Sequence, residues 1–137
     1  MTNPLFKKIL TESKRIAVVG LSPKPERPSH AVARYMLAQG YEIIPVNPGH
    51  SEILGQKSYP NLRAIPQPVD VVDIFRRSEF VPPIVDEALS IGTRYIWMQE
   101  GVVHPEAARV AESRGVPVVM DFCIKVAHSL LRMQGEI

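Results

Sequence analysis

Short apolar runs that end at a turn residue alternate along this chain with segments of helical periodicity, and this alternation constrains the fold more than any other feature. The run 15–20 (RIAVVG) is almost continuously apolar and ends in glycine, which is typical of a strand buried in a parallel sheet. In the segment 30–39 (HAVARYMLAQ), Val32, Tyr35 and Met36 follow helical spacing, with Ser29 as the expected N-cap and Gly40 as the stop. A buried strand followed by such a helix predicts a right-handed crossover to a parallel neighbour.

The same alternation continues to the C-terminus. It predicts strands at 15–20, 41–46, 69–75, 94–98 and 116–120, with a weaker edge strand at 57–59. Helices are expected from Pro4 onward, at 30–39, from Pro82 to the stop at Gly92, at 105–113 with His104 as its cap, and at 125–133, with one helical turn at 61–65. At roughly 100 to 200 residues per domain, residues 1–137 are expected to form a single domain, with the helix in 1–14 packed on it.

Strands separated by helices predict an α/β fold, here a three-layer, Rossmann-like, doubly wound parallel sheet. Six strands match the order 3-2-1-4-5-6, in which the third strand is the short one at 57–59. The first and fourth strands are then neighbours, and ligands of such sheets bind in the crevice beyond the carboxyl ends of these strands.

Composition excludes several classes of protein. A net charge of +2 and an apolar fraction of 45% argue against a disordered chain and against a basic nucleic-acid binder. The single cysteine, Cys123, has no internal disulfide partner, and four scattered histidines give no metal-binding pattern. We find no secretory h-region at the start and no apolar stretch of membrane-spanning length, so a cytoplasmic protein without membrane contact is expected.

The loop that follows the first strand lacks the common nucleotide motifs. Only Gly20 of a GxGxxG fingerprint is present, and the second strand ends in Asn47 and Pro48 where a ribose-binding acid is expected, which disfavours NAD. A P-loop is absent as well, so ATP or GTP hydrolysis has no support.

Hydroxyl and basic side chains are concentrated in that loop instead, before a predicted helix N-terminus and opposite Arg76 and Arg77. Such groups suit a ligand with several phosphates. Coenzyme A carries a diphosphate and a separate phosphomonoester of about −1.5 to −2 charge, and Phe75 or Val46 offers apolar surface for its adenine. The loop residues concerned are Ser22, Lys24, Arg27, Ser29 and His30.

Several stretches together resemble the small single-domain CoA-binding proteins of bacteria and archaea, whose fold is similar to the N-terminal CoA-binding domain of the succinyl-CoA synthetase α subunit. The stretches are VVGLSPKPERPSHAVARYM, QGYEIIPVNPGHSEILGQKSYPNL, VDVVDIFRRSE, YIWMQEGV and VVMDFCIK, within about Arg15 to Lys125. The resemblance implies that the first loop holds CoA phosphates through Gly20, Ser22, Pro23, Lys24, Arg27 and Ser29. It further implies that Val46, Asn47 and Pro48 lie along the adenosine, that Phe75 and Arg76 line the crevice, and that Gln99 faces the pantetheine.

The chain departs from this pattern in two ways. The phosphorylated histidine of the synthetase lies in a second domain, so the resemblance does not carry over synthetase chemistry. Phe122 precedes Cys123 where relatives often have a basic residue, so that loop loses an expected phosphate contact.

These observations favour non-catalytic binding of CoA or an acyl-CoA. The alternatives are an enzyme that acts on the acyl group of a CoA thioester and, less favoured, an NAD-dependent oxidoreductase. Catalysis would draw on Glu100, Asp121, Cys123 or His30, but no pair among them has a diagnostic spacing. Cys123 is read as a small buried apolar residue, or as a thiol that forms a mixed disulfide with CoA. A homo-oligomer or an unknown protein partner remains open, with a candidate apolar patch at Leu5, Phe6, Val126, Leu130 and Leu131.

Overall fold

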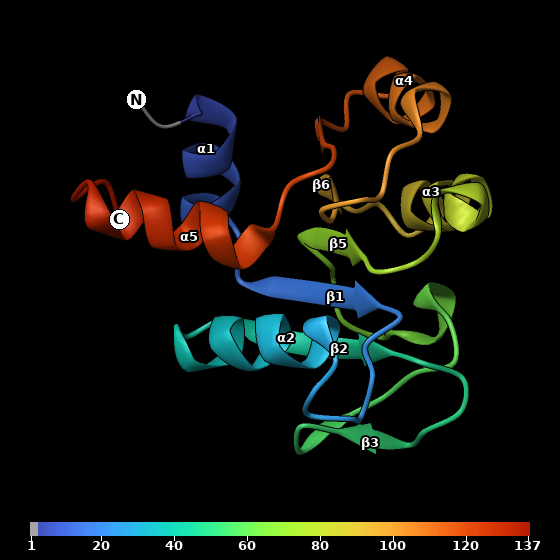
Figure 1. Ribbon diagram of the computed structural model, residues 1–137. Coiled ribbons are helices and arrows are strands. Elements are labelled where there is room, and N and C mark those ends of the chain that lie inside the picture. The colour runs from blue at the N-terminus through green and yellow to red at the C-terminus, as the bar shows by residue number, and fades with distance from the viewer. Residues whose placement is uncertain (1–2) are drawn as a thin grey trace.

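The central element is a parallel five-stranded sheet, seen in a computed structural model that describes residues 3–137 (Figure 1). The strand order is β2-β1-β5-β6-β7, and every neighbouring pair is parallel. The strands are β1 (Arg15–Val19), β2 (Glu42–Val46), β5 (Val71–Ile74), β6 (Tyr95–Met98) and β7 (Val118–Val119). Three-layer α/β architecture is therefore confirmed as the fold class.

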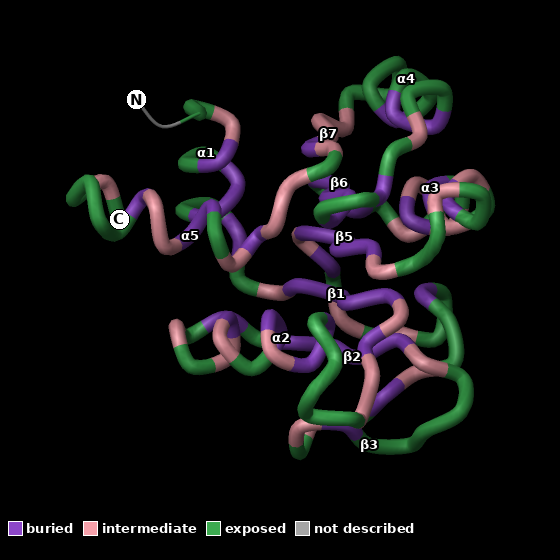
Figure 2. The backbone as a smooth tube through the Cα atoms, viewed as in Figure 1, coloured by how far each residue is buried: buried purple, intermediate pink, exposed green. Residues whose placement is uncertain are grey.

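Helices cover both faces of the sheet and create two separate cores. One face packs against α1 (Pro4–Glu12), α2 (Pro28–Ala38) and α5 (Ile124–Met133), and the other against α3 (Val81–Ser90) and α4 (Pro105–Ser113), as Figure 1 shows. Trp97 lies in the first core and Ile96 in the second, because successive strand residues point to opposite faces. Figure 2 shows most strand residues of the sheet as buried, and the two cores cover both faces, which explains the continuous apolar runs of the strands.

The helix starts follow local side-chain chemistry. Asn3 Oδ1 accepts the Leu5 N–H at 2.8 Å at the start of α1, and His104 Nδ1 accepts the Ala107 N–H at 3.1 Å, which confirms the predicted His104 cap. The prediction that Ser29 caps α2 is wrong, because the helix begins at Pro28 and its N-cap is Arg27. Proline suits the first helical position since the missing N–H would have no partner there.

The predicted third strand of the large sheet is reduced to a single bridge. Tyr59 pairs in parallel with Val46, and its N–H donates to Pro45 O at 3.0 Å, so it occupies the expected place beside β2. Pro60 follows and offers no N–H to extend the pairing. The preceding residues form an antiparallel hairpin, β3 (Glu52–Ile53) and β4 (Gln56–Lys57). In the numbering of the six predicted strands, the observed sheet has the order 2-1-4-5-6. The predicted third strand contributes only Tyr59, which is bridged to the second strand.

The two terminal helices pack on each other and border an apolar groove. Phe6 of α1 lies 4.7 Å, centroid to centroid, from Phe122 before α5. Of the patch suggested for self-association, Phe6 and Leu131 are core residues, whereas Val126 is exposed. Leu5 and Leu130 line a groove of about 540 Å³ beside β7. Among residues 3–137, no helix is both long and apolar enough to cross a membrane.

Candidate functional site

A cleft of about 580 Å³ opens where β1 and β5 end, between the loops that lead to α2 and α3. The two helices lie on opposite faces of the sheet, so this is the switch point of the doubly wound fold, where ligands of such sheets bind. Its walls are Gly20, Ser22, Arg27, Pro28, Ser29, Phe75, Arg76, Arg77 and Phe80.

Gly20 allows the two loops to meet. Its φ is +88°, and a Cβ atom built there would lie 2.4 Å from the carbonyl oxygen of Phe75. Its N–H donates to Val46 O at 3.0 Å, which ties the start of the loop to β2. Only glycine satisfies both the left-handed backbone and the close approach.

The 21–27 loop is held by hydrogen bonds from polar residues that the sequence analysis assigned to the ligand. The Ser22 N–H donates to Ser29 Oγ at 3.0 Å, and the Lys24 N–H donates to Ser22 Oγ at 3.1 Å. His30 Nδ1 lies 2.9 Å from Ser22 O, which makes this nitrogen the donor because a carbonyl only accepts. Asn47 Nδ2 donates to Leu21 O at 3.0 Å. These bonds preorganise the loop before any ligand arrives.

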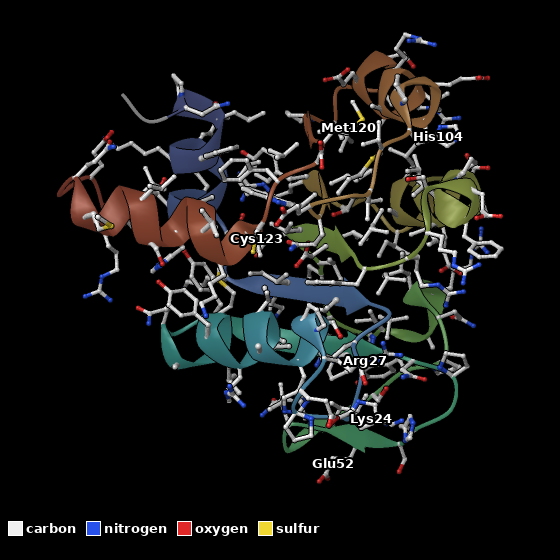
Figure 3. All side chains as sticks on the ribbon, viewed as in Figure 1. Lys24, Arg27, Glu52, His104, Met120 and Cys123 are labelled. Carbon is white, nitrogen blue, oxygen red and sulfur yellow. The ribbon has the colours of Figure 1, made fainter. Side chains whose placement is uncertain are left out.

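The arginines on the cleft walls form no ion pair within the described part of the chain. None of the ion pairs found in residues 3–137 involves Arg27, Arg76 or Arg77. Lys24 and Arg27 both project from the loop after β1 (Figure 3). Uncompensated guanidinium groups beside the first turn of α2 form an environment suited to an anion with several phosphate oxygens.

The structure brings six of the predicted site residues together as walls of the cleft, and these are Gly20, Ser22, Arg27, Ser29, Phe75 and Arg76. Pro23 and Lys24 belong to the same loop but do not line the cleft. His30 and Val46 are buried, and Pro48 is exposed beside Asn47 in the loop after β2. Gln99 is 4% exposed, and its Oε1 accepts the Ile124 N–H at 3.0 Å, so its amide is engaged at the start of α5.

Arg77, which is predicted to lie opposite the loop, is a further wall residue. Two other wall residues, Pro28 and Phe80, are not among the residues predicted for the site. Phe80 lies five residues beyond Phe75, and a short 3-10 turn (Ser78–Phe80) brings it back to the cleft. One feature of the sequence indicates that Phe80 belongs to the site. It is an aromatic residue directly before the helix start at Val81 and fits no apolar periodicity.

A smaller cavity of about 300 Å³ lies at the ends of β6 and β7. It is lined by Glu100, Asp121, Phe122, Cys123 and Val126. Asp121 has a φ of +60°, and its Oδ1 accepts the Gly101 N–H at 2.7 Å, which joins the two loops. Cys123 is the N-cap of α5 and is partly buried (Figure 3). Within the described part of the chain, no group of three or more His, Cys, Asp or Glu residues is placed to hold a metal ion.

The sheet and its cleft together define a doubly wound α/β protein with arginine side chains on the walls of its switch-point cleft. The chain belongs to the family described as "CoA binding domain", whose model matches residues 14–129. This confirms the family resemblance carried by the sequence motifs.

Individual relatives agree with this assignment. The chain is 47% identical to "Uncharacterized protein YneT" of Bacillus subtilis, over 96% of this chain and 100% of that protein. It is 27% identical to "Acetate--CoA ligase [ADP-forming] I" of Archaeoglobus fulgidus, over 89% of this chain but only 19% of the ligase. The structure of a hypothetical protein from Pyrococcus horikoshii OT3 superposes with a TM-score of 0.92 at 37% identity, covering 96% of this chain and 93% of that one.

Proposed function

We propose that this protein binds coenzyme A or an acyl-CoA in the switch-point cleft without transforming it. The observation that carries the proposal is the cleft itself, in a member of the CoA-binding domain family: no ion pair found among residues 3–137 involves its Arg27, Arg76 or Arg77. CoA supplies the phosphate charges that these cations would neutralise.

The proposed division of labour follows from the elements that form the walls. Ser22, Arg27 and the first turn of α2 face the diphosphate, because a helix N-terminus and guanidinium groups both favour negative charge. Arg76 and Arg77 are on the opposite wall and attract the remaining phosphate. His30 and Asn47 support binding through the loop, since each is hydrogen-bonded to a loop carbonyl.

Several observations favour binding over catalysis. His30 is buried and its Nδ1 is engaged by Ser22 O. No hydrogen bond found between described residues joins any two of His30, Glu100, Asp121 and Cys123, so a general base next to a nucleophile is missing from the geometry.

We also propose a cytoplasmic location for the protein. The free thiol of Cys123 fits this location.

Calorimetric titration with CoA tests the proposal. We expect CoA to bind and NAD not to bind, and Arg27→Ala to weaken CoA binding about tenfold through the loss of a charged hydrogen bond. The loss should be larger at low salt, where screening is weak. Arg34→Ala is the matched control, because Arg34 is exposed on α2, the helix that Arg27 caps, but lies outside the cleft. Absence of CoA binding, or identical affinities for the parent and Arg27→Ala, would overturn the proposed function.

The smaller cavity at the ends of β6 and β7 supports one alternative function. Glu100, Asp121 and Cys123, three of the four residues considered for thioester chemistry, line it together. If the protein acts on the acyl group of a CoA thioester, it releases free CoA thiol from acetyl-CoA or succinyl-CoA, and Cys123→Ala abolishes the release. Flat thiol traces at high protein concentration would exclude this alternative for those substrates.

A further inference from the structure

An exposed aromatic ring and a guanidinium group form a cation–π contact at the cleft. Phe80 is 44% exposed, and the guanidinium carbon of Arg76 lies 5.4 Å from the centroid of its ring. Both side chains line the switch-point cleft. They belong to one short segment between β5 and α3, so the backbone positions them together.

The ring contributes little to the folded core. Among residues 3–137, Phe80 is the one aromatic side chain in the group of exposed large apolar residues, and it belongs to neither core cluster. The following residue, Val81, is fully buried and anchors the start of α3. The Phe80 N–H donates to Arg77 O at 2.9 Å, which closes the turn that presents the ring. A phenylalanine ring kept in solvent at a cleft wall, beside a guanidinium, has the form of a stacking surface for a planar ligand group.

We propose that Arg76 and Phe80 form the wall that binds the base of the ligand, by stacking against its adenine ring. The inference rests on the proposed function and deepens it. A purine has a large π-face, which stacks on aromatic rings and on guanidinium planes without base-specific hydrogen bonds. The base then lies on the β5–α3 side of the cleft, and the phosphates lie between this wall and the loop after β1.

This placement separates the two halves of CoA. The adenosine 3′,5′-bisphosphate half provides the base and a phosphate beside the arginines, whereas the phosphopantetheine half has no planar ring. Most of the binding free energy is therefore expected from the nucleotide half. Pro28 and Phe75 supply further apolar surface in the same cleft.

Calorimetry with three ligands, CoA, adenosine 3′,5′-bisphosphate and 4′-phosphopantetheine, tests the placement on the intact protein. Phe80→Leu is expected to weaken CoA and the bisphosphate about tenfold, as loss of one base–aromatic stack does, and to leave phosphopantetheine unchanged. Phe80→Tyr keeps the ring and should bind as the parent does. Val110→Ala is the matched control, because Val110 is an apolar residue of similar exposure, 40%, on α4.

The outcomes separate this inference from the function on which it rests. If the parent binds CoA and Phe80→Leu binds it equally well, the stacking wall is wrong and the proposed function stands. If Pro48→Ala weakens the bisphosphate while Phe80→Leu does not, the base lies instead along the loop after β2. If the parent binds none of the three ligands, both proposals fail. Equal losses for all three ligands in Phe80→Leu would show a general distortion of the cleft and would also overturn the stacking role.

Discussion

Gly20 holds the two loops of the cleft closer together than any side chain would allow. Two separate constraints act at this position, the left-handed φ of +88° and the 2.4 Å approach of a Cβ atom to Phe75 O. Gly101 has nearly the same φ, +85°, but nothing within 4 Å of its Cβ position. Substitutions at Gly20 and Gly101 therefore separate two losses of stability, one from the left-handed backbone conformation and one from the close approach to the Phe75 carbonyl.

We expect Gly20→Ala to lower the free energy of unfolding by more than Gly101→Ala does. The left-handed conformation alone costs about 1–2 kcal/mol in a residue with a side chain, and the collision with the Phe75 carbonyl adds to it. Urea denaturation of both variants measures the difference. Equal losses would mean that the two loops separate without cost and that Gly20 matters only through its φ.

Asp73 is a carboxyl group buried in the sheet. It is 1% exposed on β5, between Val18 and Trp97 in the sheet register, and among residues 3–137 its Oδ1 has no hydrogen-bond partner. Burial raises the pKa of Asp73 well above its usual range. The folded state then holds this proton more tightly than the unfolded chain, so the stability contributed by Asp73 falls as pH rises from the ordinary value of 3.8 toward the folded pKa.

Asp73→Asn removes this pH dependence, because an amide stays neutral. We expect the stability of the variant relative to the parent to increase as pH rises above 3.8, the ordinary pKa of this carboxyl group, as measured by denaturant unfolding at each pH. All other titrating groups are shared, so the difference reports on Asp73. A difference that is constant across this range would contradict the buried, proton-binding carboxyl.

At the scale of elements, the contact between α2 and α5 depends on a buried histidine. The Tyr35 hydroxyl of α2 lies 2.9 Å from His128 Nδ1 and 3.0 Å from Ser129 Oγ of α5. The Tyr41 ring lies nearly perpendicular to the imidazole, with an interplanar angle of 83° and ring centroids 5.8 Å apart. Burial, followed by the nearby Arg132 charge, lowers the pKa of His128 below its ordinary value of 6.5.

This arrangement predicts acid sensitivity of the packing between the two helices. The unfolded chain takes up the proton before the folded protein does, so stability is lost as pH falls from about 6.5 through the folded pKa of His128. His128→Gln, which keeps an acceptor for Tyr35, should flatten the decline in melting temperature over that range. His50→Gln, an exposed histidine in the loop after β2, is the control. A decline that persists unchanged in His128→Gln would assign the acid loss to other groups.

At the scale of the whole molecule, the site results from the way in which the chain crosses the sheet. After β1 the chain passes to the face covered by α2, and after β5 it passes to the face covered by α3. Because β1 and β5 are neighbours, the two loops diverge and leave the cleft between them. The sheet beneath this opening is packed between two hydrophobic cores, one on each face.

The sequence alone determined the order and type of the elements, because each depends on local patterns. Continuous apolar runs marked the buried strands, and caps such as Asn3 and His104 marked helix starts. The position of the loop after Gly20 at the carboxyl end of β1 also follows from the strand order. The family followed from motifs spread over nearly the whole chain.

Only the tertiary structure decided what each polar side chain contacts. The polar side chains of His30, Asn47 and Gln99 are of the kind that bind ligands. In the fold, however, each of them is hydrogen-bonded to a backbone group. Tyr59 has strand propensity, but one bridge is all that the neighbouring Pro60 permits. Phe80 reaches the cleft through a short turn that no periodicity marks. Local patterns encode backbone conformation, whereas partners distant in sequence are fixed only when packing brings them together.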